Sequence, residues 1–337
     1  FVAQTRATPA VDEEHFRLLS GFNDIFVSIA AIILLVAVTW IGRALQPGGT
    51  WSPIPGLFIA ATAWGLAEFF TRKRRMALPS IILLLAFVGG IFFASLSTLS
   101  ELGGQESLDG RAGALVYGGA AALTAAAAWF HWRRFRVPIT VAAGASAIVG
   151  LLLALIGSII GDSPATRDVM LGFGLALGVA MFLFAMRWDS TDPLRQTGRS
   201  DVAFWLHLLA APLIVHPAFV LLGLTSGDAS TLEALVVLLL YVALGIAALA
   251  VDRRALLVSA LAYVLYALNS LFENNGVVEL SVAFTALVIG SALLLLSAFW
   301  HSARHAIVAA LPAAIQAKLP ALDRPVPVQR VADPASS

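Results

Sequence analysis

The chain has 337 residues, of which 59% are hydrophobic and 12% are charged. Soluble domains carry about 25% charged residues, so this composition excludes a water-soluble globular protein and indicates that lipid is the solvent. The absence of cysteine excludes disulfides, thiolate nucleophiles and cysteine-ligated metals. With a net charge of +1 and no basic run outside the helix connections, we expect the lipid bilayer as a partner and no nucleic acid.

The first twenty residues are polar and precede the first apolar stretch. They contain Asp12, Glu13 and Glu14, and they lack the basic start, apolar core and small-residue cleavage site of a signal peptide. We therefore expect residues 1–20 to form a short polar lead-in on the cytoplasmic side.

Residues 21–300 hold ten apolar stretches. A spanning helix needs about 20 mostly apolar residues, and each stretch is continuous rather than alternating, which excludes a β-barrel. The stretches are 25–44, 54–70, 79–99, 113–130, 138–160, 168–187, 202–223, 232–251, 255–272 and 278–300. The sequence therefore predicts an all-α transmembrane bundle of about ten spanning helices.

Basic residues are concentrated in every second connection between these stretches. The basic connections are 71–75 (TRKRR), 131–136 (HWRRFR), 187–201 and 252–254. Of the 21 lysines and arginines, only Arg43, Arg111 and Arg167 fall on the opposite side, which leaves 18 on the basic side. The positive-inside rule then places both termini in the cytoplasm, and we expect a multi-pass protein of the bacterial inner membrane.

Arginines at the basic ends of the predicted helices recur at intervals. Those at positions 74, 134, 187, 253 and 304 are 60, 53, 66 and 51 residues apart. This spacing predicts five helical hairpins in a row, with duplication as one explanation. Aromatic belts and basic inner connections recur in any polytopic protein, so the pattern leaves duplication open.

Glu68 is an ionisable residue at the end of the second apolar stretch. It lies four residues before Arg72, which places both side chains on one helix face. We interpret the two residues as an ion pair near the cytoplasmic interface, with a proton or coupling-ion site as the alternative.

Residues 187–217 comprise the longest polar connection and the helix that follows it. Asp201 is placed to cap this seventh helix. His207 and His216 lie about 13 Å apart along the helix axis and on nearly opposite faces, so they cannot share one ion or haem. Pro212 between them predicts a kink, and a proline-broken helix beside a histidine is typical of transporter sites. The alternative is that each histidine hydrogen-bonds to a neighbouring helix.

Polar side chains also gather at the outer ends of the third and ninth predicted helices. Those on the ninth helix are Tyr263, Tyr266, Asn269 or Ser270, and Glu273, and those on the third are Ser95, Thr98 and Glu101. Their spacing of three to four residues forms one stripe on each helix. We expect a polar vestibule open to the outside, or alternatively a set of interhelical hydrogen bonds that contribute about 0.6 kcal/mol each. The candidate residues for a substrate or ion pathway are His216, Asn269, Glu273, Glu101, Tyr266 and His207.

The carboxyl-terminal part is less apolar. Residues 301–319 predict an interfacial helix broken at Pro312, and the proline-rich residues 320–337 predict a disordered cytoplasmic tail. The pair His301 and His305 has a spacing that suits a metal, but no carboxylate lies near it in sequence, so we expect no metal or other cofactor.

The stretch RWDSTDPLRQTGRSDVAFWLHLLAAPLIVHP, residues 187–217, resembles a signature of bacterial inner-membrane proteins of unknown function. The resemblance covers less than a tenth of the chain. It implies a polytopic membrane protein and brings no activity with it. In outline, ten helices with both ends inside are also similar to drug/metabolite transporters, which are built as inverted five-plus-five repeats.

These patterns leave three functions open. The leading hypothesis is a transporter of a small solute or ion with a polar vestibule on the outer side. The alternative is a non-catalytic scaffold or accessory subunit, working with other membrane proteins or as a homo-oligomer, which suits the short connections. An intramembrane enzyme comes third, because no acid, base and nucleophile gather at one depth and no G-x-S-x-G or HExxH motif is present.

Overall fold

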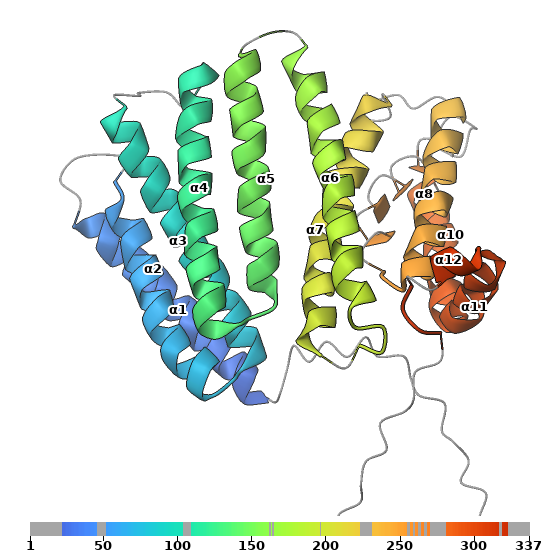
Figure 1. Cartoon of the computed structure of the whole chain (residues 1–337), viewed down its shortest axis with the longest axis horizontal. Coiled ribbons are helices and arrows are strands. Elements are labelled where there is room, and N and C mark those ends of the chain that lie inside the picture. The colour runs from blue at the N-terminus through green and yellow to red at the C-terminus, as the bar shows by residue number, and fades with distance from the viewer. Residues whose placement is uncertain are drawn as a thin grey trace, which may run out of the picture.

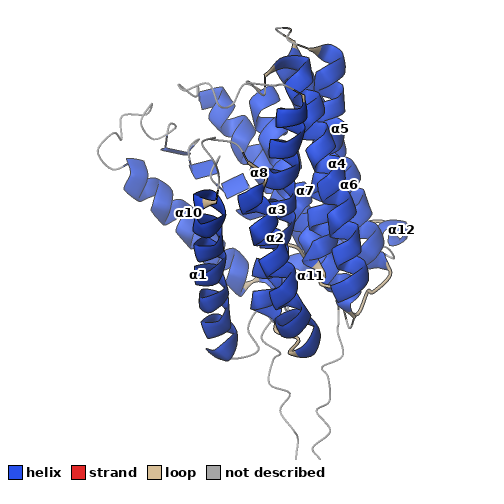
Figure 2. Cartoon of the chain, turned by 90° about the vertical axis from the view of Figure 1, so that its left-hand side faces the viewer, coloured by secondary structure: helices blue, strands red, loops and turns tan. Residues whose placement is uncertain are grey.

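The computed structural model describes residues 22–45, 52–103, 109–161, 163, 165–195, 197–222, 231–254, 257–258, 260–261, 264–265, 268–269, 281–316 and 319–322. Within these residues the chain is helical apart from short connections and contains no strand (Figure 2). The predicted all-α bundle is therefore confirmed for the described part of the chain.

The helices run roughly side by side as long rods (Figure 1). Their bounds are α1 Phe22–Ala44, α2 Ile54–Ala67, the π-helical turn η1 Glu68–Lys73, α3 Ala77–Leu102, α4 Gly110–Phe135, α5 Ile139–Ile160, α6 Thr166–Ser190, α7 Gly198–Leu221, α8 Thr231–Val251, α10 Ser281–Ala298, α11 Trp300–Ala310 and α12 Ala313–Gln316. Between α8 and α10, those residues of the predicted ninth span that the structure describes are helical.

Seven of the described helices have the length and apolarity to cross a membrane. The number rises to eight if α10 and α11, which meet at 75°, form one bent span. Exposed leucine, isoleucine and phenylalanine side chains cover the outside of these helices, as lipid-facing surfaces require. The protein is therefore a multi-pass integral membrane protein.

Three helical hairpins dominate the packing. They are α2 with α3, α4 with α5, and α6 with α7, and each pair makes a more extensive contact than any other pair of helices in the described chain. Small residues permit this approach. A Cβ atom added to Gly90 of α3 would lie 2.6 Å from the carbonyl oxygen of Gly56 in α2, so only glycine allows the two backbones to pack at this distance.

The turns of the hairpins share a backbone feature. Four non-glycine residues have a positive φ within the described chain, and they are Arg75 (54°), Arg136 (56°), Arg195 (53°) and Asp252 (59°). One falls in each basic connection, at intervals of 61, 59 and 57 residues. The three hairpin connections lie at the same end of the bundle, at the bottom of Figure 1. This end is hereafter the basic end.

The boundaries of the seventh helix differ from the prediction. The sequence placed its start at residue 202 with Asp201 as the cap, but α7 begins at Gly198 and its cap is Thr197, whose hydroxyl oxygen accepts from the backbone N–H of Arg199. The prediction for Asp201 is wrong because threonine earlier in the connection already supplies the capping oxygen. Pro212 and Pro217 both lie inside this one helix.

Candidate functional site

Buried ionisable side chains gather at the basic end between the α6–α7 hairpin and the carboxyl-terminal helices. We name this group the ion cluster and define it by Asp189, Arg195, His207, Asp252, Arg253 and Arg304. Within it, Asp189, His207, Asp252, Arg253 and Arg304 are each 5% exposed or less. Such burial of charge is costly in an apolar bundle, so each group must be compensated by its neighbours.

The local helix register explains why Asp189 and His207 face inward. Asp189 lies four residues after Ala185 and eight after Met181, on the buried stripe of α6. His207 follows Ala203 by four residues on the buried face of α7. The two side chains therefore meet across the α6–α7 hairpin, where His207 Nε2 lies 3.0 Å from Asp189 Oδ2.

Arg253 completes the first half of the ion cluster. Its Nη2 atom donates to Asp189 Oδ1 at 2.6 Å and to the carbonyl oxygen of Ser200 at 3.1 Å, and its Nε atom donates to Asp189 Oδ2 at 3.3 Å. A two-pronged guanidinium–carboxylate contact of this type fixes both partners in direction as well as in charge. One carboxylate thus joins α6, α7 and the connection after α8.

A helix-ending turn places Asp252 and Arg253 at this point. The N–H of Arg253 donates to the carbonyl oxygen of Ala248 and that of Asp252 donates to Leu249, while Asp252 takes the left-handed conformation. This bond pattern is a Schellman turn, which normally uses glycine at the left-handed position, although aspartate tolerates it. The turn directs the two adjacent, oppositely charged side chains into the ion cluster.

Asp252 is the centre of the second half. Its Oδ2 atom accepts from Arg195 Nη1 at 2.9 Å, and its Oδ1 atom accepts from the indole N–H of Trp300 at 2.8 Å. Arg304 Nε lies 3.8 Å from the same Oδ1 atom. The guanidinium of Arg195 also donates to the carbonyl oxygens of Val251 and Asp252. This half therefore ties the α6–α7 connection to α8 and α11.

Arg304 also holds a segment beyond α12. Its two terminal nitrogens donate to the carbonyl oxygens of Pro320 at 2.6 Å and Ala321 at 3.2 Å. The N–H of Ala321 in turn donates to the carbonyl oxygen of Pro193, in the α6–α7 connection. Residues 320 and 321, predicted to begin the tail, are therefore bound to the ion cluster, whereas residues 323–337 lie outside the described residues.

One ring nitrogen of His207 is hydrogen-bonded, and the other has no hydrogen-bond partner within the described residues. Because Asp189 is held by Arg253 as a carboxylate, it can only accept, so Nε2 of His207 donates to it. Nδ1 has no hydrogen-bond partner within the described part of the chain, and the ring packs edge-on against Phe182. No described nucleophile lies within hydrogen-bonding distance of Nδ1.

The residues predicted to line an outer vestibule are placed only in part. His216 lies on α7 with an exposed side chain, and Glu101 lies exposed in the last turn of α3. Asn269 is half-buried among the helical residues between α8 and α10. Tyr266 and Glu273 lie outside the described residues, so the vestibule remains a prediction. Of the six candidates, His207 belongs to the ion cluster.

Glu68 forms the ion pair that the sequence predicted. Its carboxylate accepts from Arg72 at 3.2 Å, and it also accepts from Arg134 of α4 at 2.7 Å and 2.9 Å. The second partner was not foreseen, because it lies 66 residues away across two helices. Glu68 therefore joins the α2–α3 hairpin to α4.

A second buried histidine was also missed by the sequence reading. His131 of α4 lies among the rings of Trp64, Phe87 and Phe135, and its Nδ1 atom is 3.2 Å from the hydroxyl of Thr140 in α5. The sequence grouped it with the basic residues 131–136. Its position three residues after the buried Ala128 and seven after the buried Thr124 was the available signal that it faces inward.

Comparison with protein-family models, curated proteins and solved structures finds no match to this chain. The fold and the charge pattern therefore define its class by themselves. The class is a polytopic, helical integral membrane protein with an ion cluster buried at the basic end of the bundle.

Proposed function

We propose that the protein transports a small solute or ion and that the ion cluster is the gate that closes its cytoplasmic end. The observation that carries this proposal is the burial of two carboxylates and three guanidinium groups where apolar residues would pack at no electrostatic cost. Replacing a buried ion pair by apolar residues is often neutral or stabilising, so ion pairs are not needed for stability alone. Ionisable residues inside membrane spans typically mark ion and substrate pathways.

The connections made by the ion cluster suit a gate. The contact of Arg253 with Asp189 and that of Arg195 with Asp252 both join the α6–α7 hairpin to the residues after α8, and Trp300 joins Asp252 to α11. Interfaces held by salt bridges can exchange between two discrete arrangements, as rigid-body transitions require. Opening at the basic end would break the contacts of Arg253 and Arg195 while leaving the hairpin itself intact.

The outer end supplies the other part of the proposal. His216 and Glu101 are exposed at or toward the end opposite the ion cluster, and with Asn269, Tyr266 and Glu273 they are the proposed substrate or ion pathway. The proposed topology has ten spans with both termini in the cytoplasm of a bacterial inner membrane, as the positive-inside rule favours. Beyond the eight spans that length and apolarity support, we propose the shorter apolar helix α8 as one further span and the helical residues described between α8 and α10 as part of another.

The absence of cysteine makes the proposal testable with a single introduced thiol. Ala211 is fully buried on α7, one helical turn beyond His207, where it packs against Ala248, Leu257 and Trp300. In Ala211→Cys protein in inverted membrane vesicles, a membrane-impermeant thiol reagent should label slowly, because the gate opens only transiently. Arg253→Gln should raise the labelling rate about tenfold for each 1.4 kcal/mol by which opening is eased.

Ala63→Cys is the matched control, because Ala63 is equally buried but lies in the α2 core away from the ion cluster. Its labelling should not respond to Arg253→Gln. Solutes that change the labelling rate at Ala211→Cys are the candidate substrates. If this thiol stays unreactive in folded protein with and without Arg253→Gln, the bundle is solid there, and the scaffold alternative replaces the transporter.

A further inference from the structure

A groove at the basic end is lined by arginine and aromatic side chains. It consists of two hollows that share Trp188 and Arg199, with volumes of about 270 and 350 Å³. The first is also lined by Phe184 and Arg187, and the second by Trp132 and Arg136. We name these six residues the Arg/Trp groove. It lies between the end of α6, the start of α7 and the α4–α5 connection.

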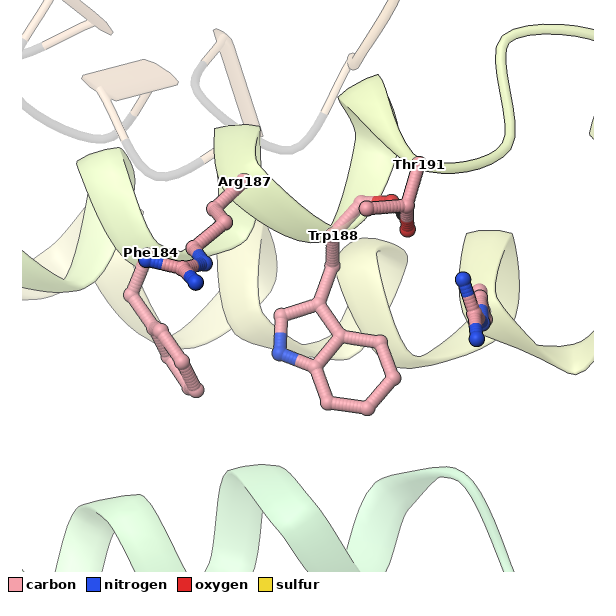
Figure 3. A pocket seen from close by; sticks show the side chains of 5 residues that line it. Phe184, Arg187, Trp188 and Thr191 are labelled. Carbon is pink, nitrogen blue, oxygen red and sulfur yellow. Dashed lines mark hydrogen bonds between the residues drawn. The ribbon is translucent and has the colours of Figure 1, made fainter.

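Figure 3 shows the α6 wall of the groove. Phe184 and Trp188 point in the same direction, away from the α6 ribbon and toward a neighbouring helix, with Arg187 between them along the chain. Phe184 is 42% exposed, and Leu183 beside it is 61% exposed. An apolar wall therefore continues from the groove onto the lipid-facing surface of α6.

The charge of the groove is uncompensated. No carboxylate is among the residues that line either hollow. The guanidinium groups of Arg187 and Arg199 are exposed, and neither has a hydrogen bond or an ion pair within the described chain, while Arg136 stacks on the ring of Trp132 at 5.4 Å. By contrast, the arginines of the ion cluster and those beside Glu68 have carboxylate partners. Three cations therefore face one groove, and together they attract an anion to it.

The chemistry of these side chains favours a phosphate group. Guanidinium groups bind phosphate oxygens through paired, directional hydrogen bonds, and they are preferred over lysine at such sites. The first turn of α7 begins at Gly198 beside the groove, so the positive end of its helix dipole adds to the attraction. Tryptophan at the same level is typical of the membrane interface, where lipid phosphates lie.

We infer that the Arg/Trp groove binds the headgroup of an anionic phospholipid, with the phosphate held by Arg187 and Arg199 and an acyl chain along Phe184 and Leu183. Basic pockets between helices on the inner side of a membrane bind such headgroups. The apolar wall favours a lipid over free phosphate, because inorganic phosphate would leave that wall without a partner. The proposal does not depend on the transport hypothesis.

Native mass spectrometry of the detergent-purified full chain tests this site. Phosphatidylglycerol, phosphatidylcholine and inorganic phosphate are titrated separately against wild type, the groove variant R187Q/R199Q and the control variant R74Q/R133Q. The control variant also removes two positive charges from the basic end of the bundle. Arg74 and Arg133 suit this purpose because both are exposed and stack on Phe69 and Trp129, outside the groove. Both variants should elute and melt like wild type, because all four side chains are exposed.

We expect phosphatidylglycerol to bind wild type at least about tenfold more tightly than phosphatidylcholine, and the groove variant to lose that preference. The control variant should stay within about twofold of wild type, because exposed charges outside the groove are screened. The single variants R187Q and R199Q should each weaken binding by about fivefold. Equal losses in the groove and control variants would mean diffuse surface attraction and would overturn the site. Competition by inorganic phosphate at the concentration of the lipid would overturn the lipid as its occupant.

Discussion

Asp189 joins three segments of the chain through one carboxylate. It accepts from His207 and Arg253 and is 1% exposed, so it has no access to water that could replace either partner. A buried ion pair contributes little net stability compared with an apolar pair, but removal of one member leaves the other charge buried without compensation. The ion cluster is therefore expected to affect the free energy of unfolding strongly only when one member of an ion pair is removed.

We predict that Asp189→Asn lowers the free energy of unfolding by about 3 kcal/mol or more, because Arg253 would remain buried without its counter-charge. Glu68→Gln is the matched control, since Glu68 pairs with two exposed arginines at the same end, and exposed pairs contribute at most about 1 kcal/mol. Denaturant unfolding followed by tryptophan fluorescence in one detergent measures both. The double variant Asp189→Asn with Arg253→Gln should recover part of the loss, and equal losses in Asp189→Asn and Glu68→Gln would contradict the assigned pairing.

At the scale of elements, the hairpin is the unit from which the bundle is built. In α2 and α3 the contact rests on Gly56 and Gly90, whose backbones approach so closely that a methyl group on either would collide with a carbonyl oxygen. Helix association in lipid depends on such close packing because lipid offers no hydrophobic driving force between helices. Substitution of two neighbouring glycines on one helix can therefore change the stability of the protein in opposite directions.

Gly89 and Gly90 allow a direct comparison. A Cβ atom at Gly90 would lie 2.6 Å from the Gly56 carbonyl oxygen, whereas at Gly89 nothing lies within 4 Å. We predict that Gly90→Ala destabilises the protein by about 2–3 kcal/mol through a forced separation of the helices. Gly89→Ala should stabilise it by about 0.5–1 kcal/mol through the loss of backbone freedom in the unfolded chain. Thermal unfolding of the two variants in parallel checks the difference, and similar shifts in both would refute the described packing.

The hairpins and the ion cluster differ in how far the sequence predicts them. Continuous apolar stretches located the helices, and the i,i+4 spacing located the pair of Glu68 and Arg72. The same criterion ends a helix where charge begins, so it assigned 187–201 to a connection, whereas α6 continues to Ser190 and α7 starts at Gly198. Asp189 was consequently read as part of a polar loop. Its partner Arg253 is 64 residues away, and only the packing of the hairpins determines that they meet.

At the scale of the whole molecule, all the basic connections described here belong to one end, and the ion cluster and the Arg/Trp groove both lie there. The two sites differ in their relation to solvent and lipid. The arginines of the ion cluster are buried and each lies near a carboxylate, whereas the arginines of the groove are exposed and no carboxylate lines the groove. The basic end of the bundle therefore holds a buried network of ion pairs and, at its surface, a groove that attracts anions.

The orientation of the bundle can be measured on the two ends of α6. Ser163 and Ser190 are both exposed, and they lie before and at the end of that helix. We predict that an impermeant maleimide labels Ser163→Cys in spheroplasts and labels Ser190→Cys only in inverted vesicles, as the positive-inside rule requires. The reverse pattern would invert the proposed topology, and labelling of both from one side would show that α6 does not span the membrane.

The left-handed residues that close the basic connections have a consequence for symmetry. They recur at intervals of 61, 59 and 57 residues, and each interval contains one helix up and one helix down. A unit of two helices returns to the face of the membrane on which it began, so copies of it share one orientation and are related by an axis along the membrane normal. Inverted-repeat transporters obtain their two access states by exchanging the conformations of halves with opposite orientation. Copies of a two-helix unit related in this way do not by themselves provide such an exchange, because none of them is inverted relative to another.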